Sequence, residues 1–472
     1  MSESKRVVSA NEFVASIIVF FICTIAAIYI AMDSSQPKDY RLLWLLPATY
    51  GILNVIFCHI YRYKTNAGIV SIQLLEFFRL VLIPIFLVMG DYYTAMSHTR
   101  TGNVETAIFL MIYEVVAVYI VLSINIKEDI SQRTTNKPKV STNALKYIIA
   151  FMILFLVIVK VLFPGSVTSF KTIFDMRSDD FTTWTGLQSY SRYELGTLAR
   201  AVGTLFTMVF TWTRYLLPIG IMVWAKKRIR RPFAAILLSL VPILLQMLFI
   251  TNTIMDGILC AFVLLLVLVK MYPSKRKTLI SLAGISFVGV IGFYFFSRYI
   301  VRFGIGSNAW GYISENATAY VGGVDNVAAM MNVGSENKWS SFFYNVYGAI
   351  PFNSSLFGLR GDKLSVFFNA ANGRRDGQIP PTIGVGWYYY TAVLAPIESV
   401  IFTHFAVKYG SKASVEKNIW KYAAYTLTAI MMAMGFTTYN AAIVLNYVTT
   451  LLIPLLVLCR YTNDLEFKMF EE

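Results

Sequence analysis

Blocks of about 20 consecutive, mainly apolar residues recur along this chain, and they constrain its fold more than any other feature. An α-helix needs about 20 apolar residues to cross the roughly 30 Å hydrocarbon core of a bilayer. The blocks are continuous rather than alternating, which argues against membrane-spanning strands. The sequence therefore predicts an all-α, polytopic membrane protein, with residues 1–472 forming a single integral membrane domain.

The composition agrees with this prediction. Hydrophobic residues make up 57% of the chain and charged residues only 14%, whereas about 25% of a soluble domain is charged. A soluble enzyme, a disordered scaffold and a disulfide-stapled secreted domain are therefore excluded. The four cysteines all lie inside apolar blocks without the paired spacing of a zinc site, so we expect them to act as small hydrophobic residues.

The apolar blocks predict about twelve transmembrane helices. Their approximate bounds are 12–32, 41–60, 69–90, 104–125, 145–163, 200–224, 232–250, 253–271, 278–300, 384–407, 418–436 and 442–459. Twelve spans place both termini on the same side of the membrane. Most Lys and Arg residues between spans fall on that side, as in the run from Lys226 to Arg231, and short cationic loops resist translocation. Both termini are therefore predicted to be cytoplasmic, and the net charge of +15 does not imply nucleic-acid binding.

Two long segments interrupt the pattern of short connections, residues 164–199 and 301–383. Both are predicted to be extracytoplasmic, and long loops of this kind are usually functional. The second segment contains many turn residues and aromatic residues, so we expect it to form short surface helices and loops, with its aromatic side chains at headgroup depth.

Cations in these outer segments are the first candidate functional groups. They include Arg192, Arg302, Arg360, Arg374 and Arg375, together with Arg200 at the start of the span after the first segment and Arg298 at the exit of the span before the second. Arginine matches phosphate oxygens in a bidentate manner, so such a set at the outer leaflet could hold a lipid diphosphate. The alternative is that these side chains are solvated loop charges or bind lipid headgroups in general. Arg298 and Arg302 are four residues apart at a helix exit, which places them on one face.

Charged residues inside the predicted spans form a second group. Glu76 and Arg79 are three residues apart and can pair on one helix face, and Arg214 could pair with Glu114 or Glu398. Intramembrane charges are costly and rarely face lipid, so these side chains should point towards partners or a cavity. Structural pairing explains them as well as a function does, and a proton-coupled transporter would also require such residues.

Sequence motifs of soluble enzymes are absent. The chain has no phosphate-binding glycine loop followed by Lys-Ser/Thr, no G-x-S-x-G elbow and no H-E-x-x-H motif. No Asp-x-Asp pair stands in an outer loop, and the three histidines are scattered. We therefore predict no cofactor and no obligatory metal.

Three stretches give the chain a resemblance to a known family. They are Tyr344–Asn353, Pro380–Tyr390, and Arg298–Arg302 leading into Tyr320–Gly323. The chain resembles the Wzy-type polymerases that build O-antigen and capsular polysaccharide, in which a proline-rich segment closes the large outer loop before an aromatic, glycine-containing helix. Arg192 followed by Gly203 is similar to a spacing found in some O-antigen polymerases. One departure is that Ala392 and Ala395 stand where that family often has glycine.

The resemblance implies a metal-independent glycosyltransferase of GT-C-like architecture in the cytoplasmic (inner) membrane of a bacterium. Its substrates would be undecaprenyl-diphosphate-linked oligosaccharides, and its partners membrane lipids, a flippase and chain-length regulators. Arg298 and Arg302, with Arg192 and Arg200, would stabilise the departing diphosphate, because its negative charge grows in the transition state. Asp325 or Glu194 would act as general base. Arg360, Arg374 and Arg375 would bind substrate, and Trp310 and Trp339 would stack on sugars, although interfacial aromatic belts are the commoner explanation of such residues.

Three alternatives remain open. An O-antigen ligase, or another lipid-linked glycan transferase, shares the architecture and chemistry and differs only in its acceptor. A flippase for lipid-linked oligosaccharides would also have central charges, but it should show pseudo-repeated halves, which this sequence lacks. A structural scaffold of the export complex would not depend on its outer arginines.

Overall fold

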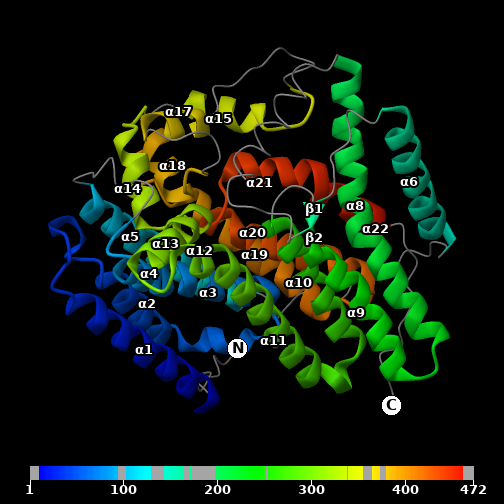
Figure 1. The fold of residues 1–472 in the computed structure, drawn as a ribbon, viewed down its shortest axis with the longest axis horizontal. Helices are drawn as coiled ribbons and strands as arrows, with labels where there is room; N and C mark the ends of the chain where they lie inside the picture. The colour runs from blue at the N-terminus through cyan, green and yellow to red at the C-terminus, as the bar shows by residue number, and fades with distance from the viewer. Residues whose placement is uncertain are drawn as a thin grey trace, which may run out of the picture. The chain divides into compact units, whose positions relative to one another are not determined.

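The computed structural model describes residues 10–93, 103–128, 143–163, 171–172, 197–250, 254–336, 339–353, 364–372 and 379–460. These residues fall into two compact units, whereas the sequence analysis treats the chain as one domain. Unit 1 comprises Met1–Arg133, Phe295–Ser414 and Thr428–Asn446. Unit 2 comprises Thr134–Tyr294, Val415–Leu427 and Tyr447–Glu472. Figure 1 shows that helices make up nearly all of the described structure.

Unit 1 contains the first and the middle parts of the chain. Its α-helices are α1 (Ala10–Ala31), α2 (Leu45–Ile56), α3 (Ala67–Phe77), α4 (Ile83–Met89), α5 (Val104–Glu128), α12 (Val301–Phe303), α13 (Ser307–Val321), α14 (Val324–Asn332), α15 (Trp339–Gly348), α17 (Leu364–Ala371), α18 (Thr382–Tyr389), α19 (Ile397–Val415), the second half of α20 (Ile419–Thr437) and most of α21 (Ala441–Tyr447). Helix α1 packs against α2, and α2 packs against α5.

Unit 2 is built mainly from α-helices. They are α6 (Asn143–Leu162), α8 (Thr197–Arg228), α9 (Pro232–Leu248), α10 (Ile254–Met271), α11 (Arg276–Phe295), the first half of α20 and α22 (Ile453–Arg460). Helix α8 contacts α6, α9 and α10. The described part of the chain contains one short antiparallel pairing of strands, β1 (Lys171–Thr172) with β2 (Phe249–Ile250). The all-α class is confirmed.

Five helical segments in the described residues are long and apolar enough to cross a membrane: Ala10–Ala31, Ala67–Met89, Val104–Ile126, Ala201–Arg228 and Ala441–Cys459. A sixth is possible if the bent pair Asp256–Met271 and Pro273–Ser286 forms one span. A polytopic membrane protein is thus supported by helix length and hydropathy. The full set of twelve spans and the orientation in the membrane stay predictions.

Two predicted spans differ in the structure. The expected span 41–60 is represented by the twelve-residue helix α2, followed by a 3₁₀ turn at Cys58–Tyr63. The expected span 384–407 is divided into α18 and α19. Pro396 immediately precedes α19, a position from which a helix is not easily extended backwards, because proline disfavours helical backbone at the residue before it.

Helices α3 and α19 approach closely where two glycines face the other helix. A Cβ atom added to Gly68 would lie 2.1 Å from the Ala406 carbonyl oxygen, and one added to Gly410 would lie 1.9 Å from Asn66 Oδ1. Asn66 caps α3 by accepting from the backbone N–H groups of Gly68 and Ile69, and its Nδ2 donates to the Val407 carbonyl at 3.1 Å. The start of α3 is therefore fixed against α19.

Part of the predicted long loop 301–383 folds into unit 1. Helix α13 packs against α4, and α14 packs against α5 and α18. Every residue from Val324 to Met331 is buried, so α14 does not lie on the surface of the unit as expected for this segment. Gly322 ends α13 in the left-handed conformation, with φ of 58°. A side chain is strained in that conformation, which glycine adopts readily.

Candidate functional site

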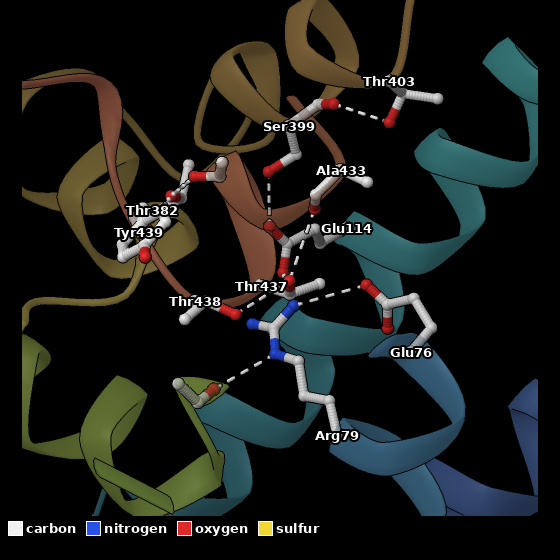
Figure 2. Close-up of polar contacts among 12 residues, drawn as sticks. Glu76, Arg79, Glu114, Thr382, Ser399, Thr403, Ala433, Thr437, Thr438 and Tyr439 are labelled. Carbon is white, nitrogen blue, oxygen red and sulfur yellow. Dashed lines mark hydrogen bonds and ion pairs between the residues drawn. The ribbon is translucent and has the colours of Figure 1, made fainter. Parts of the chain in front are cut away.

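A buried ion pair lies at the centre of unit 1. Arg79 stands in a π-helical turn, Phe78–Leu82, between α3 and α4, and its side chain is 1% exposed. Its Nη1 lies 2.8 Å from Glu114 Oε2 on α5 and 3.6 Å from Glu76 Oε1 on α3. Figure 2 shows the guanidinium group between the two carboxylates. The predicted pairing of Glu76 with Arg79 is confirmed, and π-helical turns are frequent at functional sites.

Arg79 also binds the end of α13. Its Nε donates to the Gly322 carbonyl oxygen at 3.1 Å, a contact that joins residues 243 positions apart. The last carbonyls of a helix lack partners within the helix, and they carry its negative dipole end. A buried guanidinium is a strong partner for the backbone there. Arg79 therefore ties the segment 301–383 to the ion pair between α3 and α5.

Glu114 is held on its other side by α19. The Ser399 hydroxyl donates to Glu114 Oε1, and the Thr403 hydroxyl donates to the Ser399 carbonyl at 2.7 Å (Figure 2). The sequence predicts that Arg214 pairs with Glu114 or with Glu398. The structure gives Glu114 to Arg79 instead, and Arg214 donates through Nε to Gln246 Oε1 at 2.8 Å. Glu114 and Arg214 thus each have a polar partner, as expected for a buried charge.

A further buried carboxyl group, that of Glu398, comes immediately before Ser399 in the chain. Glu398 is 4% exposed and accepts from the Tyr390 hydroxyl at 3.1 Å. Glu76, Glu114 and Glu398 are thus three of the buried carboxyl groups among the described residues of unit 1, which also include Glu12 and Asp325. An unpaired carboxylate in such surroundings costs several kcal/mol and takes up a proton instead. The geometry favours Glu398 as the protonated member, since Arg79 lies against the other two.

The proline-rich motif meets the same region. The hydroxyl of Thr382, the first residue of α18, lies 2.8 Å from the carbonyl oxygens of both Gly435 and Tyr439, and its single proton can be donated to either one. A Cβ atom added to Gly322 would lie 3.1 Å from Pro381 Cβ and 3.2 Å from the Thr437 carbonyl oxygen. The Gly322 turn, the Pro380–Pro381 pair and the end of α20 therefore pack together beside Arg79.

The predicted base Asp325 lies in the first turn of α14 and is 3% exposed. It accepts a hydrogen bond from the Tyr40 hydroxyl. The Tyr40 ring lies against Tyr92, with centroids 5.1 Å apart, and the Tyr92 hydroxyl donates to Asp33 Oδ2 at 2.6 Å. Tyr40 and Tyr92 thus connect α14 with two turns, the one that follows α1 and the one that follows α4. This arrangement is not evident from the sequence.

The two arginines expected to bind diphosphate lie at the end of α11. Arg298 stands in a π-helical turn, Phe296–Ile300, and is half-buried, whereas Arg302 in α12 is exposed. The Arg298 guanidinium carbon lies 5.7 Å from the Tyr299 ring centroid. That of Arg302 lies 5.3 Å from the Phe303 ring centroid. Their convergence on a common ligand stays a prediction.

The two predicted sugar-stacking tryptophans have different surroundings. Trp310 is half-buried and stacks on Phe86 with centroids 6.0 Å apart, which packs α13 against α4. Trp339 is 43% exposed and stacks on Tyr390. Other predicted site residues lie outside what the structure describes: Arg192, Glu194, Arg360, Arg374, Arg375 and the side chain of Arg200.

The sequence analysis missed the residues that complete the buried network. The Ser399 hydroxyl donates to Glu114, and the Gly322 carbonyl accepts from Arg79. A polar residue inside an apolar block was the available signal for Ser399, but nothing in the sequence indicates which carbonyl an arginine binds. Within the described residues, no group of three or more His, Cys, Asp or Glu side chains could hold a metal ion. No protein-family model, curated protein or solved structure matches the chain.

Proposed function

We propose that this chain is a glycosyltransferase that polymerises undecaprenyl-diphosphate-linked oligosaccharide repeat units into O-antigen or capsular polysaccharide. It would act at the outer face of the cytoplasmic membrane of a bacterium. The observation that carries the proposal is the meeting of two motifs at Arg79. The Gly322–Gly323 turn and the Pro380–Pro381 pair, both part of the resemblance to polymerases, pack together beside the Arg79–Glu114 ion pair.

This meeting gives the segment 301–383 a fixed position relative to the apolar helices. A catalytic loop must hold its groups in a productive geometry, because small displacements cost a large share of the rate. Arg79 and Glu114 are almost fully buried, so they would act as positioning residues rather than touch the substrate. The groups that contact substrate would come from the outer segments.

The proposed reaction joins a growing glycan to a new repeat unit. A hydroxyl oxygen of the acceptor repeat unit forms a bond to the anomeric carbon of the donor glycan. The bond from that carbon to the diphosphate oxygen breaks, and undecaprenyl diphosphate leaves with the electron pair. The hydroxyl proton passes to a carboxylate, for which Asp325 and Glu194 are the candidates. Asp325 is buried against Tyr40, so acceptor access to it would require Tyr40 to move.

Arg298 and Arg302 would bind the diphosphate as its charge develops. This role is tested by substitution in a strain from which the gene has been deleted, with glycan length measured on gels. Arg298→Ala and Arg302→Ala should each leave exported single repeat units in place of the ladder. The corresponding Lys variants should also fail, since Lys cannot form the bidentate contact. A normal ladder from all four variants would refute this assignment.

A transporter of lipid-linked oligosaccharide is the second candidate, and the buried carboxyl groups of Glu76 and Glu114 against Arg79, with that of Glu398 also buried, favour it. Such groups line the ion pathways of coupled carriers. The deletion strain separates the two functions. Loss of a polymerase leaves single repeat units outside the cell, whereas loss of a transporter leaves none. Polymer that accumulates on undecaprenyl diphosphate without transfer to its final acceptor would indicate a ligase instead.

A further inference from the structure

A stack of two aromatic rings reaches the surface of unit 1 at the start of α15. The indole of Trp339 lies on the Tyr390 ring, with centroids 4.2 Å apart and planes 29° apart. Trp339 is 43% exposed, whereas Tyr390 is 2% exposed. Trp339 is therefore the outer layer of a stack whose inner layer is buried.

The inner ring is fixed from several directions. The Tyr390 hydroxyl donates to the buried Glu398 at 3.1 Å. The edge of Phe342 packs on Tyr390, with centroids 5.1 Å apart, and Tyr390 belongs to a core cluster that includes Phe368 and Val385. Because the inner ring cannot easily turn, the indole above it is held in one orientation. Rigid aromatic surfaces bind ligands at a low cost in conformational entropy.

The carboxylate of Glu336 lies close to the aromatic stack in the sequence. Glu336 precedes Trp339 by three residues and is exposed. Its backbone N–H donates to the Tyr388 carbonyl at 2.9 Å, and its Oε1 accepts from the Ser341 hydroxyl at 2.9 Å. The start of α15 is thus fastened to the end of α18, and the carboxylate is oriented by the first turn of α15.

From these features we infer that Trp339 and Glu336 form a saccharide-binding subsite, which receives a sugar ring of the glycan in the polymerisation reaction proposed above. A pyranose has an apolar face of C–H groups and a rim of hydroxyl groups. The exposed indole offers a flat apolar surface to the C–H face of the sugar. The Glu336 carboxylate can accept hydrogen bonds from the hydroxyl groups. The inference rests on the proposed function, since it names the part of the substrate that this surface binds.

The competing explanation is that Trp339 anchors α15 in the lipid headgroups, as tryptophans at membrane interfaces do. The same helix provides a matched control. Phe343 lies four residues further along α15, so on the same face, and it is 62% exposed. Phe343 packs edge-on against Phe342. An anchoring role predicts similar consequences at both positions, whereas the subsite predicts consequences at Trp339.

The experiment measures binding of free oligosaccharide to the full-length protein in lipid nanodiscs by calorimetry. The probe is the repeat-unit oligosaccharide released by mild acid from the producing strain's own lipid-linked precursor, which carries neither lipid nor diphosphate. Trp339→Ala should weaken binding about tenfold, since most of the stacking surface is removed. Trp339→Phe should keep part of the affinity, Glu336→Gln should lose several-fold, and Phe343→Ala should bind like the wild type.

Two results would overturn the inference. One is wild-type affinity in Trp339→Ala, and the other is an equal loss in Trp339→Ala and Phe343→Ala. Partial binding by Trp339→Phe supports the subsite even if Trp339→Ala does not fold. Failure of the proposed function is distinguishable, because it would appear as a deletion strain whose glycan ladder is unchanged. A wild-type protein that makes polymer without binding the free oligosaccharide refutes the subsite alone.

Discussion

Arg79 and Glu114 stand 35 residues apart in the chain and form an ion pair of 2.8 Å in which neither side chain is more than 1% exposed. The pair joins the π-helical turn after α3 to α5, and the Gly322 carbonyl joins α13 to the same guanidinium. A charge in this position is stabilised only by its partners. The network is therefore one of the places at which the long segment 301–383 is held against the apolar helices, together with the packing of α13 on α4 and of α14 on α5.

Removal of Arg79 should destabilise the protein severely. Arg79→Ala leaves the Glu114 carboxylate buried beside Glu76 without a cation, and breaking a buried pair costs about 3–5 kcal/mol. The free energy of unfolding in nanodiscs checks this value. Arg62 supplies the matched control, since it pairs with Glu12 at 2.9 Å but its side chain is 36% exposed. Arg62→Ala should cost less than about 1 kcal/mol. Similar losses at both positions would contradict the role given to Arg79.

The buried carboxyl groups of Glu114 and Glu398 should respond differently to amide substitution. If Glu398 holds a proton, Glu398→Gln replaces one neutral group by another and keeps an acceptor for the Tyr390 hydroxyl. Glu114→Gln instead removes the charge that faces Arg79. We expect Glu398→Gln to melt like the wild type and to keep the glycan ladder, and Glu114→Gln to lose stability. Infrared difference spectroscopy should detect a protonated carboxyl group that disappears in Glu398→Gln. Equal destabilisation by both variants would exclude this distribution of charge.

Much of the fold could be predicted from hydropathy alone. The blocks at 12–32, 69–90 and 104–125 correspond to the spans Ala10–Ala31, Ala67–Met89 and Val104–Ile126, because a long apolar helix needs little tertiary information. The start of a new helix after Pro396, within the expected span 384–407, could in principle also be predicted from the sequence. The burial of α14 was not, because a nine-residue segment with Asp325 and Asn326 in its first turn looks like a surface helix until its neighbours are known.

The site was predicted only where its members lie on one helix. Glu76 and Arg79 share a face through their three-residue spacing, so their pairing followed from helical geometry. The contacts of Arg79 with Glu114 and Gly322 join residues 35 and 243 positions apart. A single sequence does not encode which of several buried polar groups meet across helices, and Arg214 was an equally good partner for Glu114 by composition.

The crossing of α3 and α19 should tolerate no side chain at Gly68. In Gly68→Ala the new Cβ would lie 2.1 Å from the Ala406 carbonyl oxygen, so the helices must separate, at a cost of about 1–3 kcal/mol. Gly284 in α11 is the matched control, because a Cβ there meets nothing within 4 Å. Gly284→Ala should be neutral or slightly stabilising, since alanine favours the helix. Thermal unfolding of the two variants in nanodiscs measures the difference, and equal melting temperatures would contradict the close approach.

Acid should weaken the contact between the turns after α1 and α4. Burial opposes ionisation of Asp33, but hydrogen bonds from the Tyr92 hydroxyl and from the backbone and side chain of Ser35 outweigh it and hold the pKa of Asp33 below its ordinary value of 3.8. A carboxyl group whose pKa is lower in the folded state contributes stability above its unfolded pKa and loses it as the pH falls through the folded pKa.

The wild type should therefore lose stability below about pH 4 more steeply than Asp33→Asn, which has no charge to lose. Tyr92→Phe removes one of the hydrogen bonds and should lie between the two. Melting temperatures of the three proteins from pH 7 to pH 3 test this order, and parallel curves for the wild type and Asp33→Asn would show that the bond from Tyr92 does not couple folding to protonation.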